Sequence, residues 1–129
     1  MIREYIAYSG NKLTIEWYFD SNGKSMALDY YNSLTKPERI KVLFLLKRMG
    51  DGGEIKDTTK FNYEGDHLYA FKPKADRFLC FFFAGQKIIL TNAFRKKQQK
   101  LPENEKMRAK KLKQDYENRA KNGEYYDKA

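Results

Sequence analysis

The sequence predicts an α+β fold, in which a helical hairpin packs on a twisted, mainly antiparallel sheet and a basic helix ends the chain. Three observations lead to this prediction. Residues 25–52 show two consecutive runs with helical spacing of apolar side chains. Residues 67–95 hold three β-branched or aromatic runs joined by short connections, and residues after Pro102 are helical in pattern and rich in lysine. At 129 residues, we expect one domain over 1–129.

The first element predicted is a β-hairpin. Residues 1–8 and 12–19 are β-branched and aromatic, and they flank the pair Gly10-Asn11. Glycine tolerates the positive φ that a tight turn needs, so this pair can close a hairpin. Residues 1–12 are expected to be an N-terminal extension that can supply an extra strand.

Two helices follow. In the first, Ser25 is a plausible N-cap and the apolar positions follow i, i+3, i+4, i+7 spacing, namely Ala27, Tyr30, Tyr31 and Leu34. In the second, Thr35 and Glu38 have capping-box spacing around Pro37, and the stretch "GDGG" ends the helix. Its apolar face is formed by Val42, Leu45, Leu46 and Met49.

Three strands are predicted at 67–74, 77–84 and 87–95. Their two-residue connections force antiparallel pairing, so the strands should form a meander. The run Phe78 to Ala84 is almost entirely apolar, which indicates a central strand covered on both faces. Cys80 lies within this run and is predicted to be a core residue.

The last predicted element is a basic helix. Pro102 opens it, and Glu103 and Glu105 place negative charge in the first turn, where the helix dipole favours it. Gly123 is a plausible stop, and residues 123–129 are predicted to be a loose tail.

The net charge of +9 is concentrated near this helix. Residues 95–121 hold eleven Lys or Arg and four Asp or Glu, which is 11 − 4 = +7. A one-sided positive potential favours a polyanion, either nucleic acid or an acidic protein. The alternative is a helix face whose charges only keep the protein in solution.

The sequence also predicts where the protein resides. Its start mixes charged and aromatic residues and has no signal-peptide pattern, and no apolar run approaches the ~20 residues that span a bilayer. The single cysteine fits a reducing compartment. We therefore expect a cytoplasmic protein with no membrane partner.

Several catalytic chemistries are excluded by residue types. His67 is the only histidine, which excludes a two-histidine ribonuclease and a multi-histidine zinc site, and we expect it to be structural. There is no phosphate-binding glycine loop and no acidic cluster with metal-ligand spacing. We expect no cofactor and no metal.

What remains is a set of cations at the ends of the three predicted strands: Lys72, Lys74, Arg77, Arg95, Lys96 and Lys97. Antiparallel pairing can bring these ends together into a concave basic site. Converging cations can hold a phosphate and stabilise the charge that develops during its transfer, without a metal. The alternative is that they are edge-strand charges that oppose aggregation.

Three motifs resemble the RelE/HigB superfamily of bacterial toxins, and within it the phage-derived Gp49-like branch. They are "YFDSNGKSMALDYYNSL", "LYAFKPKADRFLCFFF" and "FRKKQQKLPENEKMRAKKLKQDY". Together they cover about residues 13–119, in the order of elements predicted above. The resemblance implies a compact RelE/ParE-like toxin that cleaves mRNA, usually on the ribosome, and that a cognate antitoxin, often a helix-turn-helix protein, neutralises.

The resemblance also implies roles for the basic residues. Lys72, Arg77 and Lys96 are predicted to be catalytic, and the residues predicted to bind RNA are Lys74, Arg95, Lys97 and Lys100. Two rival functions stay open. One is a ParE-like toxin of the same fold that acts on DNA gyrase, and the other is a non-catalytic nucleic-acid-binding module whose tyrosines stack on bases.

Overall fold

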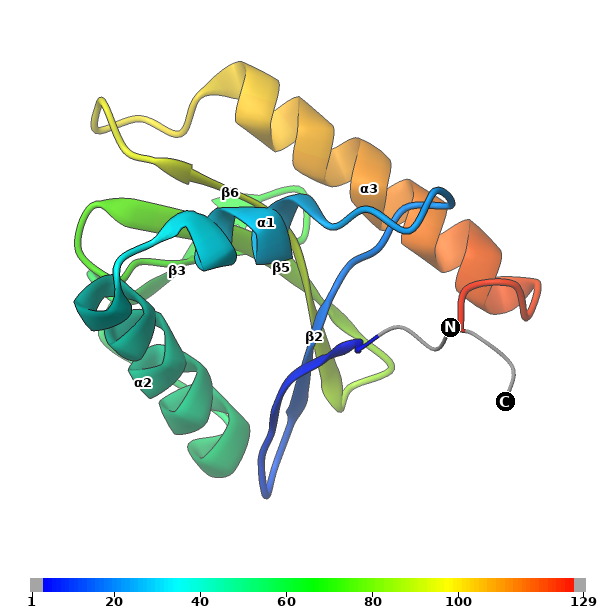
Figure 1. The fold of residues 1–129 in the computed structure, drawn as a ribbon, viewed down its shortest axis with the longest axis horizontal. Helices are drawn as coiled ribbons and strands as arrows, with labels where there is room; N and C mark the ends of the chain where they lie inside the picture. The colour runs from blue at the N-terminus through cyan, green and yellow to red at the C-terminus, as the bar shows by residue number, and fades with distance from the viewer. Residues whose placement is uncertain (1–3, 127–129) are drawn as a thin grey trace.

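The computed structural model describes residues 4–126 and confirms the α+β class (Figure 1). The described residues form three helices and one six-stranded sheet. In chain order the elements are β1 (Ile6–Ser9), β2 (Thr14–Trp17), α1 (Met26–Ser33), α2 (Lys36–Gly52), β3 (Phe61–Gly65), β4 (Leu68–Phe71), β5 (Asp76–Phe83), β6 (Lys87–Arg95) and α3 (Glu103–Lys121).

The sheet is mixed, and this corrects the prediction of a mainly antiparallel sheet. Its strand order is β1-β2-β6-β5-β4-β3. The hairpin β1-β2 and the meander β4-β5-β6 are antiparallel, as predicted. However, β2 runs parallel to β6, with Thr14 opposite Lys87 and Trp17 opposite Leu90. Both helices α1 and α2 lie between these strands in the chain, and a crossover of this length permits parallel pairing.

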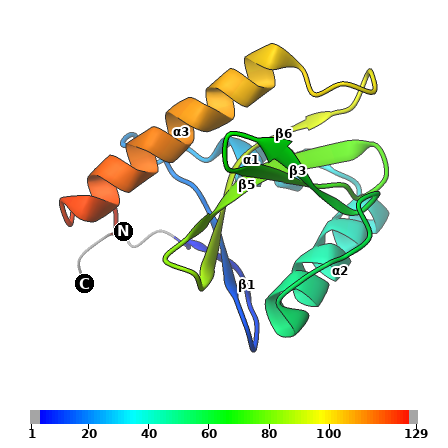
Figure 2. The same cartoon turned by 180° about the vertical axis from the view of Figure 1, so that it is seen from behind.

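The sheet is covered on both faces (Figures 1 and 2). Helices α1 and α2 cover one face, where α1 packs on β6 and α2 packs on β1 and β2. Helix α3 covers the other face and packs on β5 and β6. Each face therefore has its own buried apolar cluster.

Strand β5 lies between these two clusters, which confirms that it is a central strand. Phe78 and Cys80 point into the cluster under α1 and α2, whereas Leu79 and Phe81 point into the cluster under α3. All four are fully buried. Burial raises the pKa of the Cys80 thiol well above its ordinary value, which keeps this core cysteine protonated.

The predicted helix starts are confirmed. The Ser25 hydroxyl accepts a hydrogen bond from the backbone N–H of Leu28. Thr35 and Glu38 form the complete capping box. Gly53 has φ of +84°, the left-handed conformation that glycine adopts most easily, and it ends α2.

The structure differs from the sequence analysis at one edge strand and at the C-terminal segment. Strand β3 was not predicted, because it is short, polar at alternate positions and at the edge of the sheet. The segment after Gly123 is not loose over its described part. Tyr125 is buried and accepts a hydrogen bond from the Phe19 N–H, and the Tyr126 hydroxyl donates to Glu16. Residues 1–3 and 127–129 of the predicted hairpin and tail lie outside the described residues.

No helix among residues 4–126 is long and apolar enough to cross a membrane.

Candidate functional site

The end of the β4-β5 hairpin places two of the predicted cations on the α3 side of the sheet. Phe71 pairs with Phe78, so the next residues outward, Lys72 and Arg77, lie beside each other. Side chains alternate along a strand, and Lys72 shares the face of Ala70, which belongs to the cluster under α3. The pairing of the third strand brings Phe94 opposite Arg77.

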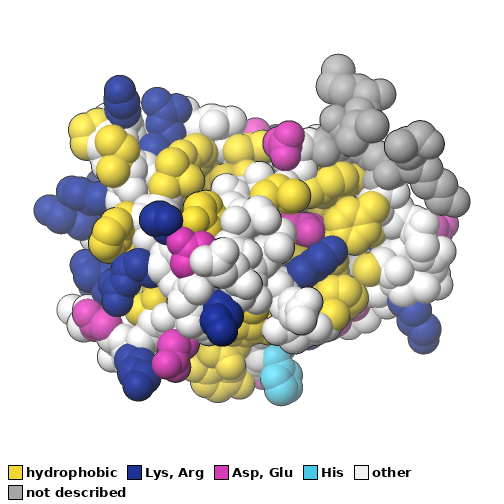
Figure 3. Space-filling model, turned by 90° about the horizontal axis from the view of Figure 1, so that it is seen from below, with side chains coloured by type: hydrophobic (Ala, Val, Ile, Leu, Met, Phe, Trp, Pro, Cys, Tyr) yellow, Lys and Arg dark blue, Asp and Glu magenta, His cyan; other side chains and the backbone are white. Residues whose placement is uncertain are grey.

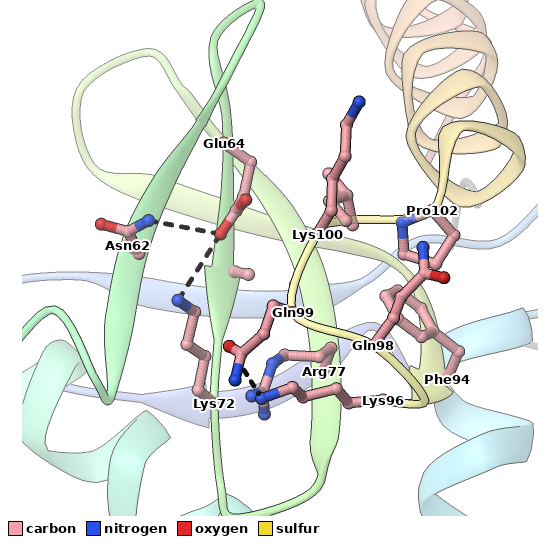
Figure 4. A pocket seen from close by; sticks show the side chains of 12 residues that line it. Asn62, Glu64, Lys72, Arg77, Phe94, Lys96, Gln98, Gln99, Lys100 and Pro102 are labelled. Atoms are coloured by element: carbon pink, nitrogen blue, oxygen red, sulfur yellow. Dashed lines mark hydrogen bonds and ion pairs between the residues drawn. The ribbon is translucent and has the colours of Figure 1, made fainter.

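A small pocket of about 160 Å³ opens at this corner of the sheet (Figure 4). Strands β3, β4, β5 and β6 form its floor, and the segment between β6 and α3 forms its wall. Its charged side chains are those of Lys72, Arg77, Lys96, Lys100 and Glu64. The structure therefore brings together the three residues predicted to be catalytic and one of those predicted to bind RNA.

Arg77 is held in place by backbone carbonyls. Its Nη1 donates to the carbonyl oxygens of Lys74 at 2.6 Å and Asp76 at 2.9 Å. Lys74 itself has φ of +58° in the turn between β4 and β5. Burial lowers the pKa of the Arg77 guanidinium, but an arginine side chain stays charged in proteins. The result is a fixed cation with further N–H groups free to meet an anion.

Glu64 and Asn62 are pocket residues that the sequence analysis missed. The Glu64 carboxylate lies 3.8 Å from the Lys72 Nζ and 3.5 Å from the Asn62 Nδ2. The side chains of Glu64 and Lys72 are 17% and 19% exposed, so solvent screens their pairing only partly. The alternation in "FNYEG" was the available signal, because it places Asn62 and Glu64 on one face of a strand.

The segment after β6 supplies the remaining cations of the pocket. The Lys96 N–H donates to the Ala75 carbonyl at 2.7 Å, which extends the pairing of β6 beyond its last residue. The Lys96 Nζ donates to the Gln99 side chain at 3.4 Å, and Figure 4 shows both side chains directed toward Arg77. Lys100, in the segment between β6 and α3, lines the same pocket.

Arg95 does not reach this pocket, although it was predicted to bind RNA. It lies on the opposite face of the sheet, where its Nη2 is 2.8 Å from Glu38 and 3.6 Å from Asp76. The Tyr30 hydroxyl donates to the same Asp76 carboxylate. Burial and this hydrogen bond raise the pKa of Tyr30 to about 12. Two carboxylates thus pair with one guanidinium, and these contacts join α1, α2, β5 and β6.

Lys74 and Lys97 also lie apart from the pocket. Lys74 is directed toward α2, where the proximity of its ammonium group lowers the pKa of Lys41. Lys97 lines a neighbouring hollow together with Tyr30 and the first turn of α3. His67 is exposed in the turn between β3 and β4 and does not line the pocket.

The pocket can bind an anion, because four cations face one carboxylate in it. An excess of fixed positive charge with oriented N–H donors suits a phosphate group. Among the described residues, no group of three or more His, Cys, Asp or Glu side chains is arranged to hold a metal ion.

A protein-family model matches this chain. No curated protein matches the chain. The model of the phage-derived protein Gp49-like family matches residues 29–114, about two thirds of the chain. The matched region runs from α1 into α3 and contains every residue that lines the pocket. The protein therefore belongs to the phage-derived Gp49-like family, which is a family of RelE/HigB-like toxins.

Proposed function

We propose that this protein is the toxin of a type II toxin–antitoxin system and that it inhibits translation by cleaving mRNA on the ribosome. The observation that carries the proposal is the convergence of Lys72, Arg77 and Lys96 on one pocket. Membership of a toxin family supports the toxin role, and the chemistry of the pocket supports a phosphodiester as the substrate.

The proposed reaction needs no metal and begins with the ribose 2′-OH. The 2′-oxygen attacks the adjacent phosphorus, and its proton passes to the Glu64 carboxylate. As the new P–O2′ bond forms, the P–O5′ bond breaks, and the Lys96 ammonium donates a proton to the leaving 5′-oxygen. The products are a 2′,3′-cyclic phosphate and a 5′-hydroxyl. General acid and base groups of this kind each contribute about 10²- to 10⁴-fold to a rate.

Glu64 is the pocket group best suited to accept the proton. It is the only carboxylate among the described residues that line the pocket. The neighbouring Lys72 ammonium, 3.8 Å away, can hold both this carboxylate and a phosphate oxygen in position. Lys72 would therefore orient the substrate and assist the proton transfer.

Arg77 would stabilise the negative charge that develops on the phosphate. Its bonds to the carbonyls of Lys74 and Asp76 fix the guanidinium before the substrate arrives. Preorganised donors are effective because they need little rearrangement during the reaction. A guanidinium can also contact two phosphate oxygens at once, which an ammonium cannot do with the same geometry.

Residues around the pocket would bind the rest of the RNA. Lys100 lies at the pocket rim and Lys97 beside it, and both precede the basic helix α3. Their charges would contact flanking phosphates and steer the protein toward ribosome-bound mRNA. A toxin family implies an antitoxin partner. We propose a helix-turn-helix antitoxin.

Expression of the chain alone tests this function. We expect arrested growth and translation, with mRNA cut and gyrase still active. An Arg77→Ala chain expressed to the same level is the control and should not cut mRNA. Intact mRNA together with poisoned gyrase would show that the protein acts as a ParE-like toxin and not as a ribonuclease. RNA binding without growth arrest would show that it is a non-catalytic binding module.

A second test concerns the metal. Cleavage of mRNA on ribosomes should be unchanged when zinc and manganese are removed with a chelator while magnesium is kept for ribosome integrity. Loss of cleavage that only zinc or manganese restores would contradict the mechanism.

A further inference from the structure

Helix α2 has an exposed apolar stripe in addition to its buried one. Its inward face consists of Val42, Leu45, Leu46 and Met49, which are nearly inaccessible. On the outward side, Ile40 and Phe44 are 56% and 59% exposed and Leu43 is 38% exposed. Ile40 and Phe44 are four residues apart and so share one side of the helix. A surface helix normally carries polar residues there, so this stripe requires a separate explanation.

The stripe borders a groove of about 320 Å³ between α2 and the turn that joins β4 to β5. Apolar atoms dominate its walls, which come from Ile40, Phe44, Leu45 and Pro73, and its cations are Lys41, Arg48, Lys60 and Lys74. No acidic side chain of residues 4–126 lines it. Seen from below, the end of the molecule where α2 lies shows hydrophobic surface next to many Lys and Arg side chains and a few Asp or Glu side chains (Figure 3).

The positive charge around this groove is only partly offset from within the chain. Proximity to Lys74 lowers the pKa of Lys41, which shows that the two ammonium groups disfavour each other's charge. Glu38 attracts the Lys41 ammonium, and Lys60 and Arg48 lower the pKa of Asp57, but both carboxylates also have partners of their own. Glu38 pairs with Arg95 at 2.8 Å, and Asp57 accepts hydrogen bonds from the N–H and hydroxyl of Thr59. Carboxylates from a partner would relieve this repulsion.

We propose that the groove beside α2 docks an acidic amphipathic helix of a partner protein. Its apolar side chains would pack on Ile40, Phe44 and Pro73, and its carboxylates would pair with the surrounding lysines and arginine. This arrangement combines an apolar anchor with electrostatic complementarity. Ile40, Leu45 and Pro73 are not aromatic and offer a nucleic acid no stacking surface, which leaves Phe44 as the single aromatic residue among the described residues that line the groove. A protein is therefore favoured over RNA as the occupant.

The turn between β4 and β5 lies between this groove and the pocket that contains Arg77. Lys74 lines the groove with its side chain, whereas its carbonyl oxygen accepts the 2.6 Å hydrogen bond from Arg77. A partner seated on α2 would thus contact the turn that orients the Arg77 guanidinium. The docking proposal does not depend on RNA cleavage, because it rests on the groove alone.

A designed peptide tests the proposal with the full-length protein. The probe is a stapled helix of about 15 residues, enough to run along most of α2, with leucines on one face and glutamates on its flanks. The matched control peptide has the same composition, with the leucines distributed around the helix. We expect saturable binding with a dissociation constant near ~10 μM, a typical weak protein contact. Backbone NMR shifts should change in residues 40–48 and 73–74.

Two pairs of variants test whether the peptide binds at the groove or is attracted only by the protein's net positive charge. Phe44→Ser and Lys41→Glu should each weaken binding about tenfold or more, equivalent to about 1.4 kcal/mol. The controls on α3 are Met107→Ser, which also replaces an exposed apolar side chain with serine, and Lys111→Glu, which repeats the charge reversal; both should leave binding within about twofold. Circular dichroism of all four checks that they are folded.

Three results would overturn the proposal. One is no saturable binding of the designed helix to the wild type. Another is equal weakening by Lys111→Glu, which would reduce the interaction to net charge. The third is tighter binding at residues 40–48 by a single-stranded RNA of matched charge than by the peptide, with RNA binding that is lost in Phe44→Ser. This result would make the groove an RNA-binding surface.

Discussion

The two faces of the sheet at the start of β5 differ in how they use the same kinds of side chain. On the face of α1 and α2, Arg95 meets the carboxylates of Glu38 and Asp76, and Tyr30 completes the cluster. On the face of α3, Lys72, Arg77, Lys96 and Lys100 share a pocket with one carboxylate, that of Glu64. The first cluster has two carboxylates for one guanidinium, whereas positive charge is in excess in the second.

We interpret the difference as one between cations that hold the fold together and cations that remain available to a ligand. A cation with its own carboxylates holds elements together, and little remains with which to bind a ligand. Cations in excess repel one another unless an anion enters, so an unbalanced pocket is suited to binding a phosphate. Arg95 and Arg77 illustrate the two cases, because they lie on neighbouring paired strands and face opposite ways.

The largest effect should come from Arg77. Arg77→Ala should reduce mRNA cleavage by about 10²- to 10³-fold, the scale of removing one preorganised donor to a transition state. Arg77→Lys should recover little, since an ammonium cannot contact two phosphate oxygens in the same way. The cost in unfolding free energy should be about 1 kcal/mol, from the two carbonyl hydrogen bonds. Cleavage rates on programmed ribosomes and urea unfolding measure the two quantities, and a fully active Arg77→Ala protein would contradict the pocket.

Glu64→Gln should follow, with a loss of about 10²-fold in cleavage, because it removes the proposed proton acceptor while keeping the shape. Binding of uncleavable RNA that lacks the 2′-OH should be unchanged or tighter, since a negative charge leaves the pocket. If cleavage persists at the wild-type rate over the whole pH range, another group accepts the proton.

Asp76 should affect stability more than any pocket residue does. It is 3% exposed, and it accepts from Tyr30 and pairs with Arg95. Asp76→Ala should lower the free energy of unfolding by about 2 to 3 kcal/mol, because it leaves a tyrosine hydroxyl and an arginine without their partner. Urea denaturation measures the change. A loss no larger than that of Arg77→Ala would remove the contrast between the two faces.

The smallest effect should be seen at alkaline pH. The pKa of Tyr30 rises from its ordinary 10.0 to about 12 because of burial and its bond to Asp76. Between these values the unfolded chain has lost the Tyr30 proton while the folded protein retains it, so stability falls as the pH rises. Tyr30→Phe removes this contribution, so the decline of unfolding free energy above pH 10 should be less steep than in the wild type. An unchanged slope would show that Tyr30 does not contribute.

The sequence was sufficient where local patterns decide the structure. The capping box at Thr35, the apolar run through Cys80 and the short connections of the meander each determine an element without help from the rest of the chain. It was insufficient for the parallel pairing of β2 with β6, because that pairing depends on how the N-terminal hairpin packs against the meander β4-β5-β6. Tyr125 packs in the core through contacts with residues about 100 positions away, and no local pattern predicts such packing.

The site was predicted in part for the same reason. The predicted antiparallel pairing brought the cations at the strand ends to one side, and the pairing of Phe71 with Phe78 in the structure puts Lys72 beside Arg77. Arg95 was assigned to the same group, but its position next to Asp76 in the paired strands turns it to the other face. Glu64 was missed because β3 was missed, and a residue's neighbours across a sheet are unknown until the strand itself is recognised.

The most direct test compares Arg77→Ala with Arg95→Ala in one assay, using purified protein and a defined mRNA on ribosomes. Both variants remove one guanidinium from neighbouring strands, so they differ mainly in the face from which it is lost. We expect cleavage to fall by about 10²-fold or more for Arg77→Ala and to stay within about threefold for Arg95→Ala, with 2′,3′-cyclic phosphate ends on the wild-type products. Equal losses in the two variants, or a larger loss for Arg95→Ala, would contradict the assignment of function to the pocket under α3.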